Sequence, residues 1–213
     1  MESKTMSEIA LGQYGGDRTL DGNALKKMYI LRHAIFHDRL GWDVLSDRGM
    51  EHDFFDVLNP IYVLVKGDGA EIQGCLRLLP TMGPYMLKDV FPQLLHGRPA
   101  PESPNIWELS RFAVSKSKSN TDQAISSFGF RETSSRMLQS AIRFAFQNSI
   151  KCYVLVTTVA IERLLHKLGL DVCRFGPPLR IGNTMAVACW FDMNSHAESV
   201  AFGRSPQLDR AAA

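Results

Sequence analysis

The chain has 213 residues, of which 45% are hydrophobic and 22% are charged, and its formal net charge at pH 7 is +2. This size and composition fit a single folded domain with a sizeable core. No apolar stretch approaches the length of a membrane span or follows a basic start, so we expect no membrane anchor and no signal peptide, and nothing indicates a nucleic-acid partner.

The first part of the chain predicts a helix, an acidic loop and a β-hairpin. Residues 1–20 are polar and lack periodicity, and we expect them to be loosely ordered. From 22 to 40, apolar residues recur at helical spacing. A long acidic loop follows at 41–60, and loops of this length tend to be functional. Two strand-like runs within 61–79 are joined by Gly67-Asp68-Gly69-Ala70, which is typical of a hairpin turn.

The second part alternates strands with helices. A stretch rich in Pro and Gly, 81–104, predicts one or two short helices. Apolar residues at helical spacing predict longer helices at 130–148 and 158–168, and the Ser- and Lys-rich segment 115–127 predicts a loop. The strands expected here are 107–114, 151–157, 172–175 and 185–192, and residues 195–213 are expected to be loosely ordered.

This order of elements predicts one α/β domain over residues 1–213. A hairpin gives an antiparallel first half, and a helical crossover between later strands gives a parallel pair. We therefore expect a mixed, mostly antiparallel sheet sandwiched by helices.

The strand at 107–114 carries a carboxylate and a guanidinium three residues apart, at Glu108 and Arg111. Side chains alternate faces along a regular strand, so residues i and i+3 point in opposite directions. Either one charge faces water, as in a half-exposed strand with a structural ion pair, or the strand bulges and brings both charges to one side. Bulges are enriched beside active sites.

Charge is distributed unevenly along the chain. Acidic residues outnumber basic ones between Asp38 and Asp56, and basic residues outnumber acidic ones between Arg131 and Arg180. The acidic segment can face a cationic small molecule, and the basic half can face an acidic partner. Taken alone, each cluster is more simply explained as a solvated face.

Cysteines and histidines give no pattern of a metal centre. The four cysteines are widely spaced in apolar surroundings without a CxxC pair, which predicts reduced, buried thiols of a cytoplasmic protein, with no zinc site and no disulfide frame. His33 and His37 are four residues apart on a predicted helix, a spacing that can bind a metal, but no third ligand is evident. We expect no metal site.

Several separate motifs resemble those of the acyl-homoserine lactone synthases, the autoinducer synthases of bacterial quorum sensing. The likeness extends from about Met28 to Asp192. The motifs are Arg32-x3-Phe36-x5-Trp42, Glu51-x-Asp53-x-x-Asp56, Arg77, Glu108-x-x-Arg111, Gly83-Pro84-Tyr85-Met86-Leu87-Lys88 with Phe91-Pro92, and Arg174-Phe175-Gly176-Pro177. The resemblance implies a fold similar to that of the GNAT-type N-acetyltransferases.

The resemblance also implies an activity. Enzymes of this family transfer an acyl chain, usually from acyl carrier protein, to the amine of S-adenosylmethionine, and then close the lactone with loss of methylthioadenosine. No cofactor is expected, because S-adenosylmethionine and the acyl-phosphopantetheine thioester are both substrates.

The residues present suit this chemistry. Acyl transfer needs a base for the amine, and Glu108, acting through a water, is favoured over Asp53 and Asp56 because apolar neighbours would raise its pKa. Backbone N–H groups exposed by the bulge can stabilise the tetrahedral oxyanion. Arg77 can brace Glu108 or Asp56, or form a purely structural pair with Asp56. We assign Glu108, Arg111, Asp53 and Arg77 to the catalytic set.

Three binding regions are expected from the same resemblance. The S-adenosylmethionine site comprises Arg32, Phe36, Trp42, Asp53, Asp56 and Phe112, with aromatic faces and Asp53 suited to the sulfonium. Arg32 and Arg111 can bind the substrate carboxylate or pair with acidic residues of the loop, and Phe36 and Trp42 can instead belong to the core. The acyl-chain pocket comprises Leu155, Thr157, Thr158, Met86 and Phe91. The carrier-protein docking surface comprises Lys151, Arg163, Lys167 and Arg174.

Family members that prefer 3-oxo chains often carry Thr at the position of Leu155. An apolar side chain cannot donate to a 3-oxo group, so we expect an unsubstituted or 3-hydroxy chain. A shift of the alignment by one or two residues would bring Thr157 to this position instead.

Two alternative functions stay open. An N-acyltransferase of the same fold that uses acyl-CoA and another amine would carry a Gly-rich phosphate loop, but residues 115–132 hold only Gly129. A binding module that senses an acyl chain without turnover would have no need of a base such as Glu108.

Overall fold

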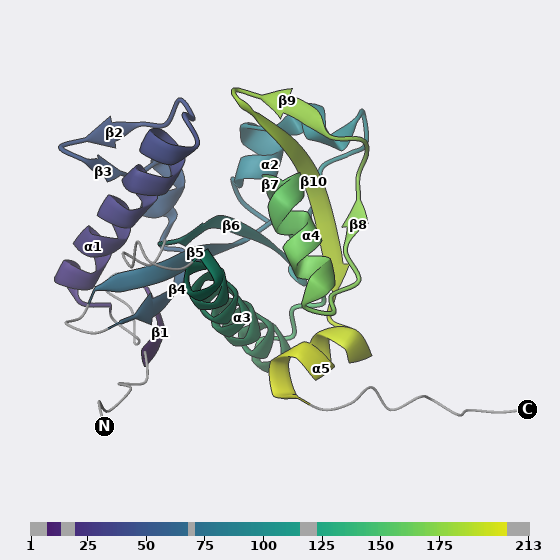
Figure 1. The fold of residues 1–213 in the computed structure, drawn as a ribbon. Helices are drawn as coiled ribbons and strands as arrows, with labels where there is room; N and C mark the ends of the chain where they lie inside the picture. The colour runs from purple at the N-terminus through teal and green to yellow at the C-terminus, as the bar shows by residue number, and fades with distance from the viewer. Residues whose placement is uncertain (1–7, 14–19, 68–70, 116–122, 204–213) are drawn as a thin grey trace, which may run out of the picture.

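The computed structural model describes residues 8–13, 20–67, 71–115 and 123–203. An eight-stranded sheet runs through this part of the chain and is covered by helices on both faces (Figure 1). In spatial order its strands are β1 (Glu8–Gly12), β4 (Ile61–Lys66), β5 (Ile72–Pro80), β6 (Ile106–Val114), β7 (Cys152–Thr158), β10 (Thr184–Asp192) and β8 (Cys173–Arg174), with β9 (Leu179–Ile181) pairing β10. Only β6 and β7 pair in parallel among these strands, so the predicted mixed, mostly antiparallel sheet is confirmed.

Alternate side chains of a strand point to opposite faces of the sheet, and helices pack on both faces. Tyr62 and Leu64 of β4 pack under α1 (Gly22–Arg32), whereas Val63 and Val65 pack under α3 (Gln123–Gln147). The face with α3 also carries α4 (Val159–Lys167) and α5 (Ser195–Phe202), and the face with α1 carries the short elements η1 (His33–Arg39, π-helical), η2 (Phe54–Leu58), α2 (Met86–Asp89) and η4 (Pro92–Leu95). Within the described ranges no helix is long and apolar enough to cross a membrane.

The predicted bulge lies in β6. Cys75 of β5 pairs with Ala113 and Arg77 pairs with Ser110, so Arg111 and Phe112 together oppose a single residue of β5. Arg111 has a φ of 51°, in the left-handed region that a residue other than glycine rarely adopts. The extra residue turns the Arg111 side chain toward the same side as Glu108, and the prediction of a bulge is confirmed.

Strands β6 and β7 diverge just beyond Glu108. Their parallel pairing covers Ile106 to Glu108 on β6 and ends at the pair Glu108–Val154. Past this point β6 stays with β5 and β7 stays with β10, as the splayed ribbons in Figure 1 show. The divergence leaves room for a cavity in the middle of the sheet.

Both segments expected to be loosely ordered contain regular structure. Glu8–Gly12 forms the edge strand β1, and Ser195–Phe202 forms α5. Asn194 caps this helix, because its side chain accepts the Ala197 N–H at 3.0 Å. The sequence prediction failed because β1 is short and polar-flanked and because α5 buries only small side chains, Ala197 and Ala201. The other residues of both segments lie outside the described ranges, apart from Gln13, Gly203 and the buried Leu20.

Other boundaries differ modestly from the prediction. The acidic stretch 41–60 contains a small hairpin, β2 (Ser46–Asp47) with β3 (Met50–Glu51), and the helix η2. The helix expected from residue 130 begins at Gln123. The expected turn at Asp68–Ala70 and most of the loop at 115–127 fall outside the described residues.

Candidate active site

A cavity of about 250 Å³ opens where β6 and β7 separate. Its walls come from η1, from α2 and the residues after it, from the bulged half of β6, and from the junction between β7 and α4. The residues expected from the sequence that line it are Phe36, Trp42, Met86, Phe91, Glu108, Arg111, Phe112, Thr157 and Thr158. The structure therefore brings to one place four of the five predicted acyl-pocket residues, three of the six S-adenosylmethionine-site residues and two of the four catalytic residues.

One wall of the cavity is aromatic. The rings of Phe36 and Trp42 are stacked, with centroids 5.4 Å apart and planes at 21°. Trp42 Nε1 donates a hydrogen bond to Thr184 Oγ1 at 3.0 Å, which fixes the indole, and the Arg111 guanidinium lies 5.3 Å from the Phe36 centroid. A fixed aromatic surface of this kind suits a planar or cationic group.

Glu108 lies at the floor of the cavity with its side chain fully buried. Burial raises its pKa above the ordinary carboxyl value, although hydrogen bonds from backbone N–H groups act in the opposite direction. Those donors are Leu87 N–H at 2.8 Å and Met86 N–H at 3.0 Å, one to each carboxylate oxygen. A held carboxylate with a raised pKa has the properties of a general base.

Behind the cavity, three arginines and three carboxylates form a buried ionic cluster. Arg32 pairs with Glu51 and with Asp56, the latter at 2.8 and 3.0 Å. Arg77 donates to Asp53 at 2.5 and 3.0 Å and to Asp56 at 2.7 Å. Arg111 completes the cluster through Glu51 at 2.8 Å and Asp53 at 2.7 Å. The formal charges cancel, which is what burial of so many ions requires.

Local structure places the carboxylates of this ionic cluster. Asp53 caps η2, and its backbone N–H donates to the Asp56 side chain at 2.8 Å in a reciprocal capping box. The Tyr62 hydroxyl lies 2.6 Å from Asp56 Oδ1. Burial acts to raise the pKa of Asp56, but the guanidinium groups of Arg32 and Arg77 hold that pKa well below its usual range.

The cluster changes the roles expected of four residues. Arg32, Asp53, Asp56 and Arg77 do not line the cavity, because their charged groups neutralise one another behind it. Arg77 is thus bound to Asp56 and Asp53, and the sequence alternative of a structural pair describes it better than contact with substrate. Arg111 alone belongs both to the cluster and to the cavity wall.

Asp53 and Asp56 also border a second pocket of about 780 Å³, between α1 and η2. This pocket is wider and more open than the cavity and shares none of its lining residues.

The acyl-pocket residues separate into two groups. Met86, Phe91, Thr157 and Thr158 line the cavity, whereas Leu155 is buried beside it and lines an adjoining space of about 10 Å³. Thr157 lines both spaces, whereas Leu155 lines only the smaller one. The other residues common to both are Ser110, Phe112, Val156 and Ile161.

Sequence reasoning missed two charged residues of the site. Arg39 follows Phe36 by three residues on η1 and lines the cavity; burial lowers its pKa, and no ion pair is found for it among the described residues. Its helical spacing from Phe36 was the available signal. Glu51, quoted only as part of a motif, is fully buried and joins Arg32 to Arg111.

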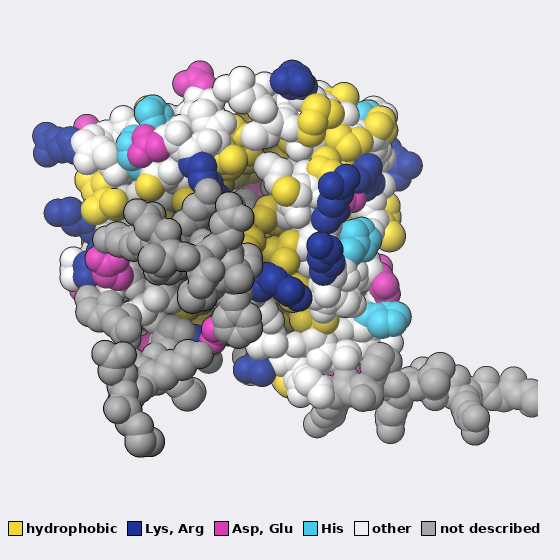
Figure 2. Space-filling model, viewed as in Figure 1, with side chains coloured by type: hydrophobic (Ala, Val, Ile, Leu, Met, Phe, Trp, Pro, Cys, Tyr) yellow, Lys and Arg dark blue, Asp and Glu magenta, His cyan; other side chains and the backbone are white. Residues whose placement is uncertain are grey.

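The residues expected to dock an acidic partner lie on α4 and the neighbouring strands. Arg163 and Lys167 are exposed on α4, four residues apart, and Lys151 precedes β7. Arg174 binds Glu162 of α4 through two contacts of 2.5 and 2.6 Å, which joins β8 to the helix. Lys and Arg side chains form a row over this side of the molecule, next to exposed hydrophobic side chains (Figure 2).

Comparisons with known proteins agree with this geometry. The model of the autoinducer synthase family matches residues 17–200. An acyl-homoserine-lactone synthase of Pseudomonas aeruginosa is 42% identical over 193 residues, which cover 90% of this chain and 93% of that protein. The crystal structure of the AHL synthase LasI superposes with a TM-score of 0.83 at 39% identity, covering 96% of this chain and 99% of that one.

Structures of relatives with bound molecules are also similar. TofI in a ternary complex with an inhibitor and MTA has a TM-score of 0.77 at 32% identity, covering 93% of this chain and 98% of that chain. BjaI, a CoA-dependent acyl-homoserine lactone synthase with SAM and isopentyl-CoA, has a TM-score of 0.77 at 26% identity, covering 93% and 89%. A putative N-acetyltransferase from Lactobacillus plantarum, 14% identical with a TM-score of 0.55 over 88% of this chain and 99% of that one, shares the fold.

Proposed function

The chain belongs to the autoinducer synthase family and is an acyl-homoserine-lactone synthase, and we propose that it takes its acyl chain from a carrier-protein thioester, with Glu108 as the base of acyl transfer. The amine of S-adenosylmethionine attacks the thioester carbonyl and the carbon–sulfur bond breaks, which releases the carrier-protein thiol; the methionine carboxylate then displaces methylthioadenosine from the γ-carbon. The observation that carries this assignment of the base is the buried Glu108 carboxylate, held at the cavity floor with a raised pKa.

Glu108 can accept a proton without leaving its place. Each carboxylate oxygen accepts one backbone N–H, which leaves a second lone pair on each oxygen for a water in the cavity. The water relays the proton from the substrate ammonium, which frees the amine for attack. The oxyanion that forms is stabilised by backbone N–H groups at the Arg111–Phe112 bulge. These steps use the two substrates alone, and we propose no cofactor for them.

The aromatic wall suits the other end of the amine substrate. S-adenosylmethionine carries a sulfonium cation and a planar adenine, and Phe36 and Trp42 offer stacked faces to such groups. Arg39 and Arg111 supply positive charge on the same wall for the methionine carboxylate.

A carrier-protein donor is supported by the exposed basic side chains on and near α4. By contrast, Gly129 is the only glycine of residues 115–132 and lies inside α3, so this segment lacks the Gly-rich loop that would bind the phosphates of CoA. BjaI shows that CoA is used by a similar protein, and acyl-CoA is therefore the alternative donor.

The four basic residues differ in their distance from the cavity. Arg163 lies about 6 Å along the helix from the first residue of α4, close to Ala160 and Ile161 of the cavity wall. Lys151 lies at the other end of β7, about 23 Å from Thr158. Of these two residues, Arg163 lies nearer the cavity and is the one tested.

Charge reversal tests this docking surface. We expect Arg163→Glu to raise the KM for acyl carrier protein about five- to tenfold, equivalent to about 1 kcal/mol, with kcat little changed. The matched control is Lys26→Glu, an exposed lysine on α1. Steady-state rates are measured with acyl carrier protein and with acyl-CoA. An unchanged KM for the carrier protein in Arg163→Glu would place docking elsewhere.

The buried Leu155 tests acyl-chain selectivity. We expect the wild type to favour unsubstituted or 3-hydroxy donors, and Leu155→Thr to raise its relative rate with a 3-oxo donor about three- to tenfold, the effect of one hydrogen bond. Thr157→Val is the matched variant at the cavity surface and should leave the preference unchanged. Donors compete in one reaction, and the lactones are quantified by mass spectrometry. A preference that shifts in Thr157→Val would assign the selectivity to Thr157.

One assay separates the functions. Purified protein is incubated with S-adenosylmethionine and a panel of acyl carrier proteins and acyl-CoAs, and products are identified by mass spectrometry. Methylthioadenosine and an acyl-homoserine lactone are expected in equal amounts. Faster turnover with acyl-CoA than with every carrier protein would overturn the proposed donor, and absence of both products with all donors would contradict the activity. We also propose a cytoplasmic location, which agrees with free thiols at all four cysteines; three are buried as expected, whereas Cys173 is exposed.

A further inference from the structure

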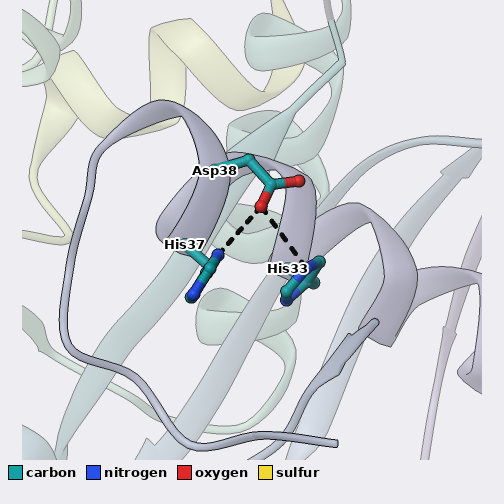
Figure 3. Close-up of side chains that lie close together, drawn as sticks. All are labelled: His33, His37 and Asp38. Atoms are coloured by element: carbon teal, nitrogen blue, oxygen red, sulfur yellow. Dashed lines mark hydrogen bonds and ion pairs between the residues drawn. The ribbon is translucent and has the colours of Figure 1, made fainter. Parts of the chain in front are cut away.

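Three side chains with metal-binding atoms gather on η1 and none of them lines the cavity. One ligand atom from each of His33, His37 and Asp38 lies within 4.8 Å of the others. Both imidazoles meet the same carboxylate oxygen (Figure 3): Asp38 Oδ1 is 2.8 Å from His37 Nδ1 and 3.4 Å from His33 Nε2. The three residues together offer two nitrogen ligands and one oxygen ligand.

The π-helical backbone explains how the third ligand reaches the other two. In η1 the Leu40 N–H donates to the Ile35 carbonyl, five residues back, at 3.1 Å. In an α-helix a residue at i+5 points to a different side from residue i, whereas the wider π turn brings it back toward residue i. Asp38 is at i+5 from His33, so the π turn places its carboxylate beside the histidine pair.

A hydrogen bond on its other ring nitrogen orients His33. Ser46 Oγ, from the β2–β3 hairpin, lies 2.6 Å from His33 Nδ1, which leaves Nε2 directed at Asp38. Metal-binding histidines are commonly oriented in this way, with the ring nitrogen that does not bind metal held by a neighbouring polar group. Ser46 therefore acts as a positioning group for His33.

We propose that His33 Nε2, His37 and Asp38 bind one first-row transition cation, of the class of Zn²⁺, Ni²⁺ or Cu²⁺. Imidazole ligands suit these ions, whereas Mg²⁺ and Ca²⁺ take oxygen ligands. The 3.4 Å separation of His33 Nε2 from Asp38 Oδ1 is close to the edge of about 3.4 Å expected for tetrahedral ligands at about 2.1 Å. The sequence alone predicts no metal site here, because the spacing of His33 and His37 does not show Asp38 to be a third ligand.

Binding requires one ring to turn. The two imidazoles are stacked at 4.7 Å with planes at 15°, so their nitrogen lone pairs lie in nearly parallel planes that do not meet at one point between the rings. His33 is held by Ser46, whereas the half-exposed His37 exchanges its 2.8 Å contact with Asp38 for the ion when its ring turns. The remaining coordination positions face solvent and take water.

The position of this metal site connects it with the active site. The same π-helical segment presents Ile35, Phe36 and Arg39 to the cavity. A cation that joins His33 to His37 and Asp38 fixes this turn in the folded state only, so it stabilises the wall against which the amine substrate is proposed to lie. The ion takes no part in the chemistry of acyl transfer.

Metal titration tests the proposal. Protein without a histidine tag is freed of metal with a chelator, dialysed, and titrated with ZnCl₂ by isothermal calorimetry, with the Tm followed in parallel. We expect one ion per chain and a Tm that rises with ZnCl₂. His37→Gln and Asp38→Asn, both at exposed positions, should weaken binding tenfold or more, and Ser46→Ala should weaken it about tenfold.

A matched control comes from a second histidine–aspartate pair. His196 Nδ1 lies 2.5 Å from Asp171 Oδ2, and both side chains are exposed, but this pair lacks a second imidazole. His196→Gln should leave Zn²⁺ binding unchanged. The proposal is overturned by the absence of saturable binding in the wild type, by wild-type affinity in both His37→Gln and Asp38→Asn, or by loss of binding in His196→Gln.

Discussion

Replacing Glu108 by Gln is expected to lower turnover by about two to four orders of magnitude, the usual contribution of a general base. The amide cannot take the proton from the substrate ammonium. It also places an NH₂ group against one of the two backbone donors, Met86 N–H or Leu87 N–H, so the variant disturbs the start of α2 as well as the chemistry. Single-turnover rates of acyl transfer measure the chemical step directly.

A neighbouring carboxylate separates these two effects. Asp89 accepts the Tyr85 N–H at 2.9 Å at the start of the same helix but is exposed and does not line the cavity. Asp89→Ala therefore removes a side-chain acceptor of a backbone N–H at the start of α2 without removing the proposed base, and it should retain most of the activity. Equal losses of activity in both variants would mean that Glu108 only holds α2.

The pH dependence gives a second test of the base. Because burial raises the pKa of Glu108, the carboxylate becomes protonated at a higher pH than an ordinary glutamate, and kcat/KM should fall as the pH drops through that raised pKa. This acid limb should be absent from the residual activity of Glu108→Gln. If kcat/KM of Glu108→Gln still falls at low pH in the same way, another group titrates and another group is the base.

Local sequence left two possibilities for β6, and the neighbouring motifs decided between them. Two charges three residues apart on one strand share a face only if an extra residue intervenes, and the catalytic role that the resemblance implies for Glu108 and Arg111 favoured that bulge over a half-exposed strand. The helix and strand periods around it likewise predicted most of the sheet. The short edge strand β1 and the alanine-rich α5 escaped because neither carries a run of large apolar side chains.

The pairing within the ionic cluster was not predictable in this way. Arg32, Arg77 and Arg111 could each pair with any of three carboxylates, or with substrate, and residues that meet are up to 60 positions apart. Only the folded packing decides which charges are buried together behind the cavity. The contact of Asp38 with the two histidines was likewise not predictable from the sequence. It depends on a π-helical turn, and the spacing of apolar residues does not distinguish such a turn from an α-helix.

Replacing Arg77 by Met is expected to lower the free energy of unfolding by about 3–5 kcal/mol, since it leaves buried carboxylates without their partner. The Arg77 guanidinium is fully buried and contacts Asp53, Asp56 and Ser110. Activity should fall with it, because Asp53 also holds Arg111 at the cavity wall. Urea denaturation followed by circular dichroism measures the stability, and steady-state rates measure the activity.

Two further variants make the Arg77 result specific. Lys66 lies on β4, the strand that pairs with the β5 strand of Arg77, and its 3.9 Å contact with Glu8 is at the surface. Lys66→Met should therefore lower the free energy of unfolding by about 1 kcal/mol or less. Arg77→Lys keeps the charge but loses the planar fork that reaches both aspartates, so its stability should lie between those of Arg77→Met and the wild type. If Arg77→Met is no more destabilising than Lys66→Met, the cluster does not stabilise the fold, and its arginines are then retained for the reaction alone.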